Sequence, residues 1–400
     1  MFRHLAPVTT PLAPITLLRA LRSPADVVAQ FSKALEEYLD VPGCFLAASG
    51  RTAFYLLLKS LQSATDSTAR RMVILPAYTC PSLAKVVLDA GLQPCLVDIS
   101  PITFVYDSVQ LAAHLDQQTL AVLIVHPFGI PQAVEPVQEL AKQVGAVLIE
   151  DAAQAMGAAV DGKLVGTLGD YGLFSLGPGK PLSTGGGGIV CVRDPANAGR
   201  VAASWQALSA ASTLASVMAL ARLTAFTMAF HPQGWWLATR AGAHRIGDNE
   251  ASWAYTLRGL TSAQAAIGLM QLPQLAEYNR QRRAKAEQMI ERLREFDFVQ
   301  IPAAADGNRA QPIYLRLPVL VASAALREEL FQQLWAAGIG VGRMYGRTLA
   351  EFFPTLANKP YPGAEQIARR LLTLPTHHYV TDPDIARIIQ VFRAANDVTL

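Results

Sequence analysis

Short, continuous apolar runs alternate with helical patterns along the first half of the chain. Six runs have the length and composition of strands that are buried on both faces. They are MVIL (72–75), PCLVDI (94–99), LAVLIVH (120–126), GAVLIE (145–150), YGLFSL (171–176) and GIVCV (188–192). Helical spacing of apolar residues appears between them, in residues 52–62, 82–91 and 133–145. This alternation predicts an α/β fold around a mostly parallel sheet.

The pattern changes after about Thr261, where two helices precede a strand-like run at 311–321, a helix within 324–342 and a closing helix at 384–396. We therefore expect a smaller C-terminal α+β domain. The predicted organisation is an N-terminal arm (1–30), a large domain (31–250) and a small domain (251–400). Prolines interrupt the apolar N-terminus, so we expect it to pack on the body of the protein or on a partner subunit.

Composition narrows the class of protein. The 400 residues are 51% hydrophobic with a net charge of +3, which allows a large core and gives no basic surface for nucleic acid. The four cysteines form no CxxC pair, so we expect reduced thiols and no metal site. The N-terminus lacks the unbroken apolar segment of a signal peptide, and a cytoplasmic location is expected.

Lys180 lies in the stretch GDYGLFSLGPGKPLSTGGGG (169–188), between a predicted strand and four glycines. A lone loop lysine is often solvated, and a glycine run is often only a flexible turn. Glycines also allow a sharp bend or a close approach of the backbone to another group. The order of residues is not that of a phosphate-binding P-loop.

Two other stretches place polar groups at predicted element ends. Glu150 and Asp151 end a strand, at the edge of an α/β sheet where ligands bind, although an acid there can also cap a helix. Ser49, Gly50, Arg51 and Thr52 begin a strong helix, where free amides form either a phosphate site or an ordinary N-cap.

A lysine, a strand-end acid and a phosphate-binding helix end together fit pyridoxal 5′-phosphate. This cofactor needs an amine for a Schiff base, an acid for its ring nitrogen and donors for its phosphate.

Seven stretches also resemble the DegT/DnrJ/EryC1/StrS family of pyridoxal-phosphate sugar aminotransferases over roughly residues 31–400. They are SGRTAFYLLL, LPAYTCPSLAKVVLDAGLQPCLVDI, VHPFG, IEDAAQAMGA, VGTLGDYGLFSLGPGKPLSTGGGG, AQAAIGLMQL and LLTLPTHHYVTDPDI. The resemblance implies the aspartate-aminotransferase fold (fold type I), with a seven-stranded, mainly parallel sheet and a smaller C-terminal domain. It also implies a homodimer with its sites at the subunit interface.

The resemblance implies a role for each matching residue. Lys180 would hold the cofactor as a Schiff base, and Asp151 would bind the pyridinium nitrogen. Gln154 would lie near the phenolic oxygen of the cofactor. Ser175 would bind phosphate together with the Gly50–Thr52 turn, which includes Arg51.

Two positions depart from the family pattern. Cys80, in PAYTC, occupies the place where the family commonly has an aromatic residue that stacks on the cofactor ring, so Tyr78 and His126 are the candidates for stacking. The stretch WAYTLRGLTSAQAA also lacks an asparagine that reaches the other subunit's phosphate in the family, and Arg258 is a candidate substitute.

The segment at about 204–240 does not follow the family pattern. Residues 211–230 are mostly apolar, with Arg222 as their one charge, and Trp235 and Trp236 follow. A helix that is apolar on nearly all sides is buried or contacts a membrane. We expect a helix at the dimer interface; the alternatives are a helix in the membrane interface, anchored by the two tryptophans, or a membrane span, which the central arginine disfavours.

These observations predict an aminotransferase that moves an amino group from an amino acid, glutamate by analogy with the family, to a nucleotide-linked keto-sugar. One alternative is the same chemistry on a lipid-linked or other apolar ketone at a membrane surface. Another is a non-catalytic binding or regulatory protein of the same fold, which the presence of Lys180, Asp151 and Gln154 argues against. Lys180 also argues against the dehydratases of the family, which have histidine there.

Overall fold

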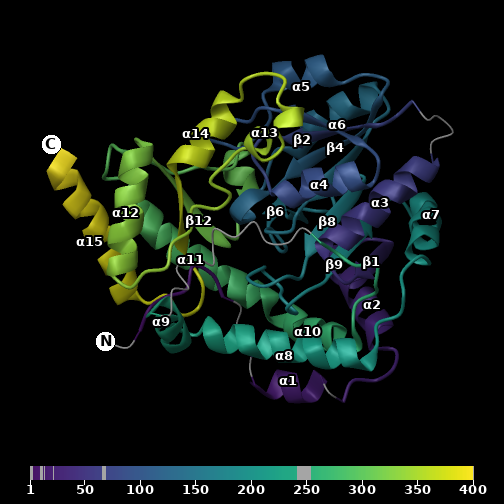
Figure 1. Cartoon of the computed structure of the whole chain (residues 1–400), viewed down its shortest axis with the longest axis horizontal. Coiled ribbons are helices and arrows are strands. Elements are labelled where there is room, and N and C mark those ends of the chain that lie inside the picture. The colour runs from purple at the N-terminus through teal and green to yellow at the C-terminus, as the bar shows by residue number, and fades with distance from the viewer. Residues whose placement is uncertain are drawn as a thin grey trace.

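The fold is built on a seven-stranded sheet with the order β1-β9-β8-β5-β4-β2-β3 (Figure 1). The computed structural model describes residues 3–9, 12, 14–20, 22–64, 69–240 and 254–399. The strands of the sheet are β1 (Gly43–Ala47), β2 (Met72–Pro76), β3 (Gln93–Val97), β4 (Thr119–Val125), β5 (Val147–Asp151), β8 (Tyr171–Ser175) and β9 (Gly188–Val192). Within this sheet β9 runs antiparallel to its neighbours β1 and β8, and the remaining pairs are parallel. The predicted α/β fold with a mostly parallel seven-stranded sheet is confirmed.

Helices cover both faces of the sheet, as parallel strands require. In the N-terminal two thirds of the chain they are α1 (Pro14–Ala20), α2 (Val27–Leu39), α3 (Gly50–Ala64), α4 (Pro81–Asp89), α5 (Ser108–His114), η1 (Pro127–Gly129), α6 (Val134–Gln143), α7 (Pro195–Trp205), α8 (Thr213–Ala229), α9 (Pro232–Arg240) and α10 (Ser262–Gln271). One apolar core lies under α3 and α4, and a second core joins α2 and α10 to the other face.

The C-terminal part has its own three-stranded antiparallel sheet, with the order β10-β12-β13. Its elements are η3 (Leu272–Gln274), α11 (Leu275–Leu293), β10 (Val299–Gln300), η4 (Gly307–Arg309), β12 (Arg316–Val321), α12 (Ala324–Ala336), α13 (Leu349–Phe352), η5 (Pro354–Leu356), α14 (Pro362–Arg370), β13 (Leu371–Pro375) and α15 (Asp382–Thr399). A third core fills the space between this sheet and α11, α12 and α15. A minor sheet, β11 (Ala310–Gln311), β6 (Ala159–Val160) and β7 (Lys163–Leu164), connects this part to the large sheet.

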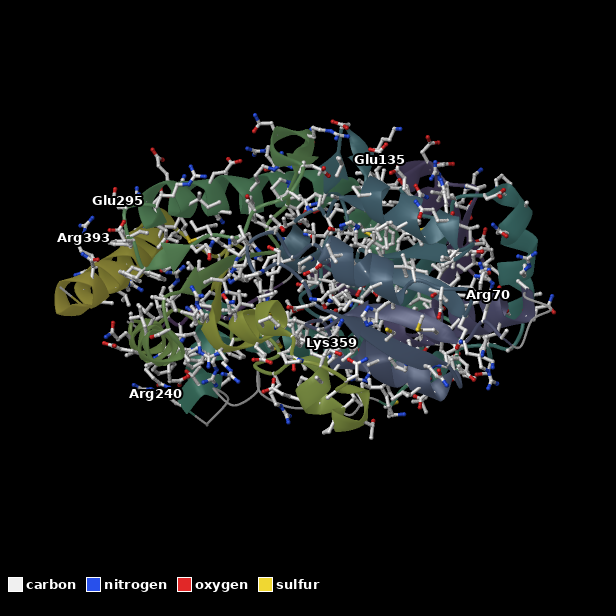
Figure 2. The ribbon with its side chains drawn as sticks, turned by 90° about the horizontal axis from the view of Figure 1, so that it is seen from above. Arg70, Glu135, Arg240, Glu295, Lys359 and Arg393 are labelled. Atoms are coloured by element: carbon white, nitrogen blue, oxygen red, sulfur yellow. The ribbon has the colours of Figure 1, made fainter. Side chains whose placement is uncertain are left out.

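The third core begins at Ala286, apart from Leu5 of the arm, whereas the buried residues of α10 belong to the second core. The predicted domain boundary between residues 250 and 251 lies outside the described residues and stays a prediction. Figure 2 shows charged side chains such as Arg70, Glu135 and Arg393 at the margins of the molecule, away from these cores.

The N-terminal arm packs on the body of the protein, as expected. The Arg3 guanidinium pairs with Asp384 at 2.7 Å, and Leu5 forms a parallel bridge with Ile339 and is buried in the third core. Farther along the arm, the Val8 side chain lies against Gly179, which precedes Lys180. The first described residues therefore connect the C-terminal domain to the loop that carries the lysine.

The apolar segment folds as α8 and α9, whose axes meet at 85°. Within the described residues, no single helix is long and apolar enough to cross a membrane. The alternative in which both tryptophans anchor the protein in a membrane does not hold for Trp235, which is buried within the chain. Its ring is 3% exposed and packs against Phe230 and Trp335, with centroid distances of 4.7 and 6.2 Å.

The four glycines allow close packing around the start of β9. Gly185 and Gly187 have φ angles of +75° and +121°, a region that favours glycine. A Cβ atom on Gly188 would overlap the Ser49 carbonyl oxygen and the backbone of Gly50. The glycine run thus lets β9 pair beside the start of α3, and it belongs to the architecture of the site rather than to a flexible turn.

We predict that Gly188→Ala destabilises the protein, because the added methyl group must displace the backbone at the start of α3. Overpacking of this kind costs about 1–3 kcal/mol. Thermal unfolding followed by circular dichroism should show a lower midpoint. Gly199→Ala in α7 is the matched control, since a Cβ there meets nothing within 4 Å and alanine favours the helix. An unchanged midpoint for Gly188→Ala would contradict the packing argument.

Candidate active site

The predicted site residues meet at one edge of the large sheet. Five parallel strands end there, and each is followed directly by polar or aromatic residues. The ends of β1, β2, β4, β5 and β8 bring together Ser49–Thr52, Tyr78–Cys80, His126, Asp151 and Ser175. In α/β sheets the carboxyl edge is where ligands bind, and here the glycine-rich loop after β8 adds Lys180.

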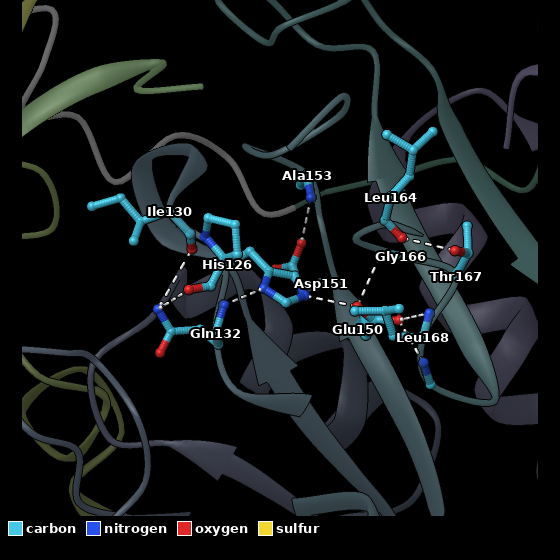
Figure 3. Close-up of polar contacts among 12 residues, drawn as sticks. His126, Ile130, Gln132, Glu150, Asp151, Ala153, Leu164, Gly166, Thr167 and Leu168 are labelled. Carbon is cyan, nitrogen blue, oxygen red and sulfur yellow. Dashed lines mark hydrogen bonds and ion pairs between the residues drawn. The ribbon is translucent and has the colours of Figure 1, made fainter. Parts of the chain in front are cut away.

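Adjacent residues at the end of β5 serve different purposes, because consecutive side chains of a strand point to opposite faces. Glu150 is fully buried, and its carboxylate accepts hydrogen bonds from the backbone N–H groups of Gly166 (2.8 Å), Leu168 (2.7 Å) and Gly169 (2.6 Å) (Figure 3). His126 supplies a fourth contact, with 2.9 Å between Nε2 and Oε2. Glu150 therefore holds the turn before β8 in place.

The tautomer of His126 follows from its contacts. The backbone N–H of Gln132 donates to Nδ1 at 2.9 Å, so the ring proton of a neutral imidazole lies on Nε2 and points to Glu150 (Figure 3). The imidazole is fully buried. It has no open ring face in this arrangement, and the suggestion that His126 stacks on a cofactor stays a prediction.

Asp151 faces the site and is 7% exposed. Burial raises the pKa of its carboxyl, whereas the hydrogen bond from the Ala153 N–H (3.0 Å) and the nearby Lys180 and His126 act in the opposite direction. An acid in this position can hold a proton-bearing ring nitrogen opposite it, because the ion pair would offset the cost of burial.

Lys180 is surrounded by protein but keeps some accessible surface. Burial lowers the pKa of its ammonium, and the Arg316 cation adds to this effect, whereas Asp151 and Cys80 oppose it. A lowered pKa increases the fraction of free amine near neutral pH, which a lysine needs to act as a nucleophile or as a base. Its half-buried position disfavours the interpretation of Lys180 as a solvated loop lysine.

The start of α3 lies against the end of β8. A Cβ on Gly50 would be 3.5 Å from the Cβ of Ser175, so the Ser175 side chain adjoins the helix N-terminus. The N-cap interpretation of this helix start is confirmed, and the phosphate site stays a prediction. Ser49 caps the helix through the Thr52 N–H (3.1 Å), and the Thr52 hydroxyl donates to the Thr256 carbonyl (2.9 Å). Among the predicted phosphate ligands, Thr52 is therefore already engaged within the chain.

Gln154 and Tyr78 line a small pocket beside the strand ends, together with Thr79, Phe128 and Tyr345. The Gln154 amide oxygen accepts from the Phe128 N–H at 3.2 Å. Cys80 contacts the Ser82 hydroxyl at 3.0 Å and lies within hydrogen-bonding reach of Tyr345.

In the described part of the chain, the contacts of Arg258 near the site are made by its backbone. Its carbonyl accepts from the Ala48 N–H at 2.8 Å, directly after β1, and it bridges Ser209. A role for its side chain toward a partner subunit stays a prediction.

Sequence reasoning missed two residues that the C-terminal domain brings to the site. Tyr345 is half-buried near Asp151, and its ring lies 5.6 Å from that of Tyr78. Arg316, at the start of β12, is close enough to Lys180 to lower the pKa of the lysine ammonium. Its Nη1 atom lies 3.5 Å from the Sδ atom of Met344. The only available signal for Arg316 was a single charge within the apolar run IYLRLPVLV.

Burial lowers the pKa of Arg316 to about 10. Within the described residues, no carboxylate pairs with its guanidinium. The site therefore holds two half-buried cations, Lys180 and Arg316, and one buried acid, Asp151, which makes it suited to an anionic ligand.

The fold is that of pyridoxal-phosphate-dependent aminotransferases. The chain superposes on the aminotransferase TlmJ from Streptoalloteichus hindustanus with a TM-score of 0.78 at 24% identity, covering 99% of this chain and 100% of that one. It superposes equally well on PseC from Helicobacter pylori, an aminotransferase involved in the biosynthesis of pseudoaminic acid (TM-score 0.78, 18% identity, 99% and 100% coverage).

A model of the DegT/DnrJ/EryC1/StrS aminotransferase family matches residues 19–393, and the chain belongs to this family. It is 29% identical to the GDP-perosamine synthase of Caulobacter vibrioides, over 90% of this chain and 88% of that protein. It is also 29% identical to a UDP-N-acetyl-3-dehydro-α-D-glucosamine 3-aminotransferase of Acidithiobacillus ferrooxidans, over 88% and 83% of the two chains. The protein is thus an aminotransferase.

Proposed function

We propose that this aminotransferase uses pyridoxal 5′-phosphate to move an amino group from an amino acid, glutamate, to a nucleotide-linked keto-sugar. The observation that carries the reaction is the half-buried Lys180 amine, which interacts electrostatically with the Asp151 carboxylate at the carboxyl edge of the sheet. The substrate class is supported by the relatives, whose names specify GDP-, UDP- and dTDP-linked sugars.

The residues at the sheet edge fit the cofactor. Ser175 and the N-terminus of α3 at Gly50 and Arg51 suit a phosphate, because the first amides of a helix and its dipole favour an anion. Asp151 suits the pyridine nitrogen, and the amide of Gln154 suits a phenolic oxygen. When bound, pyridoxal phosphate supplies an aldehyde that captures amines and a ring that accepts electrons.

The chain's own groups provide the proton transfers and the electrostatics. Lys180 Nζ would hold the cofactor covalently, and its free amine would act as the base that takes the α-proton of the donor and returns it. Asp151 would keep a proton on the ring nitrogen. Tyr78 and Tyr345 would line the pocket beside these groups.

An acceptor that is lipid-linked or otherwise apolar is the alternative substrate class. The exposed apolar side chains of α8 and α9 favour it, since they would bring the enzyme to such a substrate. The expected cytoplasmic location stays a prediction.

We predict that borohydride reduction of the protein with pyridoxal phosphate attaches the cofactor to Lys180. Peptide mass mapping should locate the adduct, and Lys180→Ala should lose both the adduct and transamination, which falls about 10²–10⁴-fold or more without the base. Lys163→Ala, an exposed lysine on β7, is the control and should keep both. An adduct on another lysine, or no conversion with any amino donor, would overturn the proposal.

We propose that Arg316 binds the carboxylate of the amino-acid donor, and we predict that Arg316→Leu raises KM for the donor about 10–100-fold, as expected for a charged hydrogen bond. Loss of this cation should also raise the pKa of Lys180, measured as the pH dependence of Lys180 acetylation in the cofactor-free protein.

Arg292→Leu, an exposed arginine on α11, is the control for the Arg316 test. An unchanged donor KM in Arg316→Leu would refute this role, and the acetylation profile separates that outcome from failure of the aminotransferase proposal itself.

We also propose a homodimer, on the basis of the family that the chain resembles. Light scattering in detergent-free buffer should give twice the 43.0 kDa mass of one chain. A stable monomer that catalyses transamination would disprove the dimer.

A further inference from the structure

The exposed large apolar side chains gather on three helices at one margin of the molecule. Of eleven such side chains among the described residues, seven lie on α1, α8 and α9. They are Ile15, Leu18, Leu214, Val217, Met218, Met228 and Leu237, and we call them the apolar face. Figure 1 shows α1 and α8 along the lower margin, with α9 at the end of α8, and both α1 and α8 pack on α10.

The α8 residues of the apolar face are different from those that α8 buries in the core. Ala215, Leu220 and Leu223 are the buried residues of α8, and a Cβ on Gly185 would lie 3.1 Å from Leu223, so the inner side of the helix is packed against the glycine run. On the outer side, Leu214 and Met228 are each 68% exposed. Exposed apolar residues that are clustered in this way mark a contact surface.

The charges of these helices are all of one sign. Residues of α1, α8 and α9 include Arg19, Arg222 and Arg240 and not a single aspartate or glutamate. All three arginines are exposed, and Figure 2 shows Arg240 at the edge of the molecule. The Arg240 guanidinium also lies over the Trp236 ring at 4.3 Å, a pairing of cation and indole at the rim of the apolar face.

This charge pattern disfavours a second copy of the chain as the occupant. A twofold interface places the same patch on both subunits, so it would gather the arginines of both copies with no acid from these helices to pair with them. An anionic surface has the complementary charge. Apolar side chains that enter the interface while arginines reach phosphate groups are typical of helices that lie in the plane of a membrane.

We propose that the apolar face binds the surface of a membrane that contains anionic lipids. The binding does not depend on which ketone the enzyme aminates, and it goes beyond the proposed reaction. The outer side of α8 carries part of the apolar face, and its inner side packs against the glycine run that follows Lys180. A docked molecule would therefore hold its active-site edge close to the bilayer.

The test is flotation of the full-length protein with phosphatidylcholine vesicles, with and without phosphatidylglycerol. The wild type should float with the anionic vesicles and be released by salt, which screens the arginines. Exchange of Met218 and Met228 for glutamate, two side chains that are 56% and 68% exposed, should reduce the bound fraction about tenfold or more. Val109→Glu is the matched control, since Val109 is 78% exposed on α5, and it should float like the wild type.

Arg222→Glu provides a second variant in case the methionine exchanges disturb folding, and it should lower binding to anionic vesicles selectively. Light scattering of each variant measures its oligomeric state. Absence of flotation in the wild type, or undiminished flotation of both Arg222→Glu and a folded double variant, would overturn the proposal. Dissociation of a wild-type dimer by these exchanges would also overturn it and assign the apolar face to the subunit interface.

Discussion

The site depends on the alternation of two acids at the end of β5. Glu150 turns inward and takes four hydrogen-bond donors, from His126 and from the turn at 166–169, so a buried carboxylate acts as the centre of a rigid frame. Its neighbour Asp151 must then face the opposite side, toward the ligand edge. The position of Asp151, the acid that we propose for the reaction, is fixed by the structural acid beside it, and the strand β8 that leads to Lys180 starts from the same frame.

The electrostatics of the site depend on Arg316, a cation that the C-terminal domain adds. The large domain alone would place one amine opposite one acid. Arg316 brings a second cation near Lys180, which helps to lower the pKa of the Lys180 ammonium, so the site suits an anionic ligand.

The sequence was informative where the signal is local. Buried parallel strands appear as unbroken apolar runs, so the strands from β2 to β9 around the site, and the polar residues that follow them, could be predicted. The strand β1 was missed, because GCFLA mixes small residues with only two large apolar ones. Tyr345 and Arg316 could not be assigned to the site from the sequence. The docking of the C-terminal domain brings them to Lys180, and no pattern in the neighbouring residues indicates this contact. The burial of Trp235 within the chain could not be decided from the sequence for the same reason, because its partner Trp335 lies one hundred positions away.

The N-terminal arm ties together parts of the chain that are far apart in the sequence. The Arg3 guanidinium pairs with Asp384, which is 381 positions away, and the Val8 side chain lies against Gly179, the residue before Lys180. One short segment therefore links the closing helix of the C-terminal domain to the loop that carries the lysine. The shape of that loop depends on contacts made by both ends of the chain as well as on the strand that precedes it.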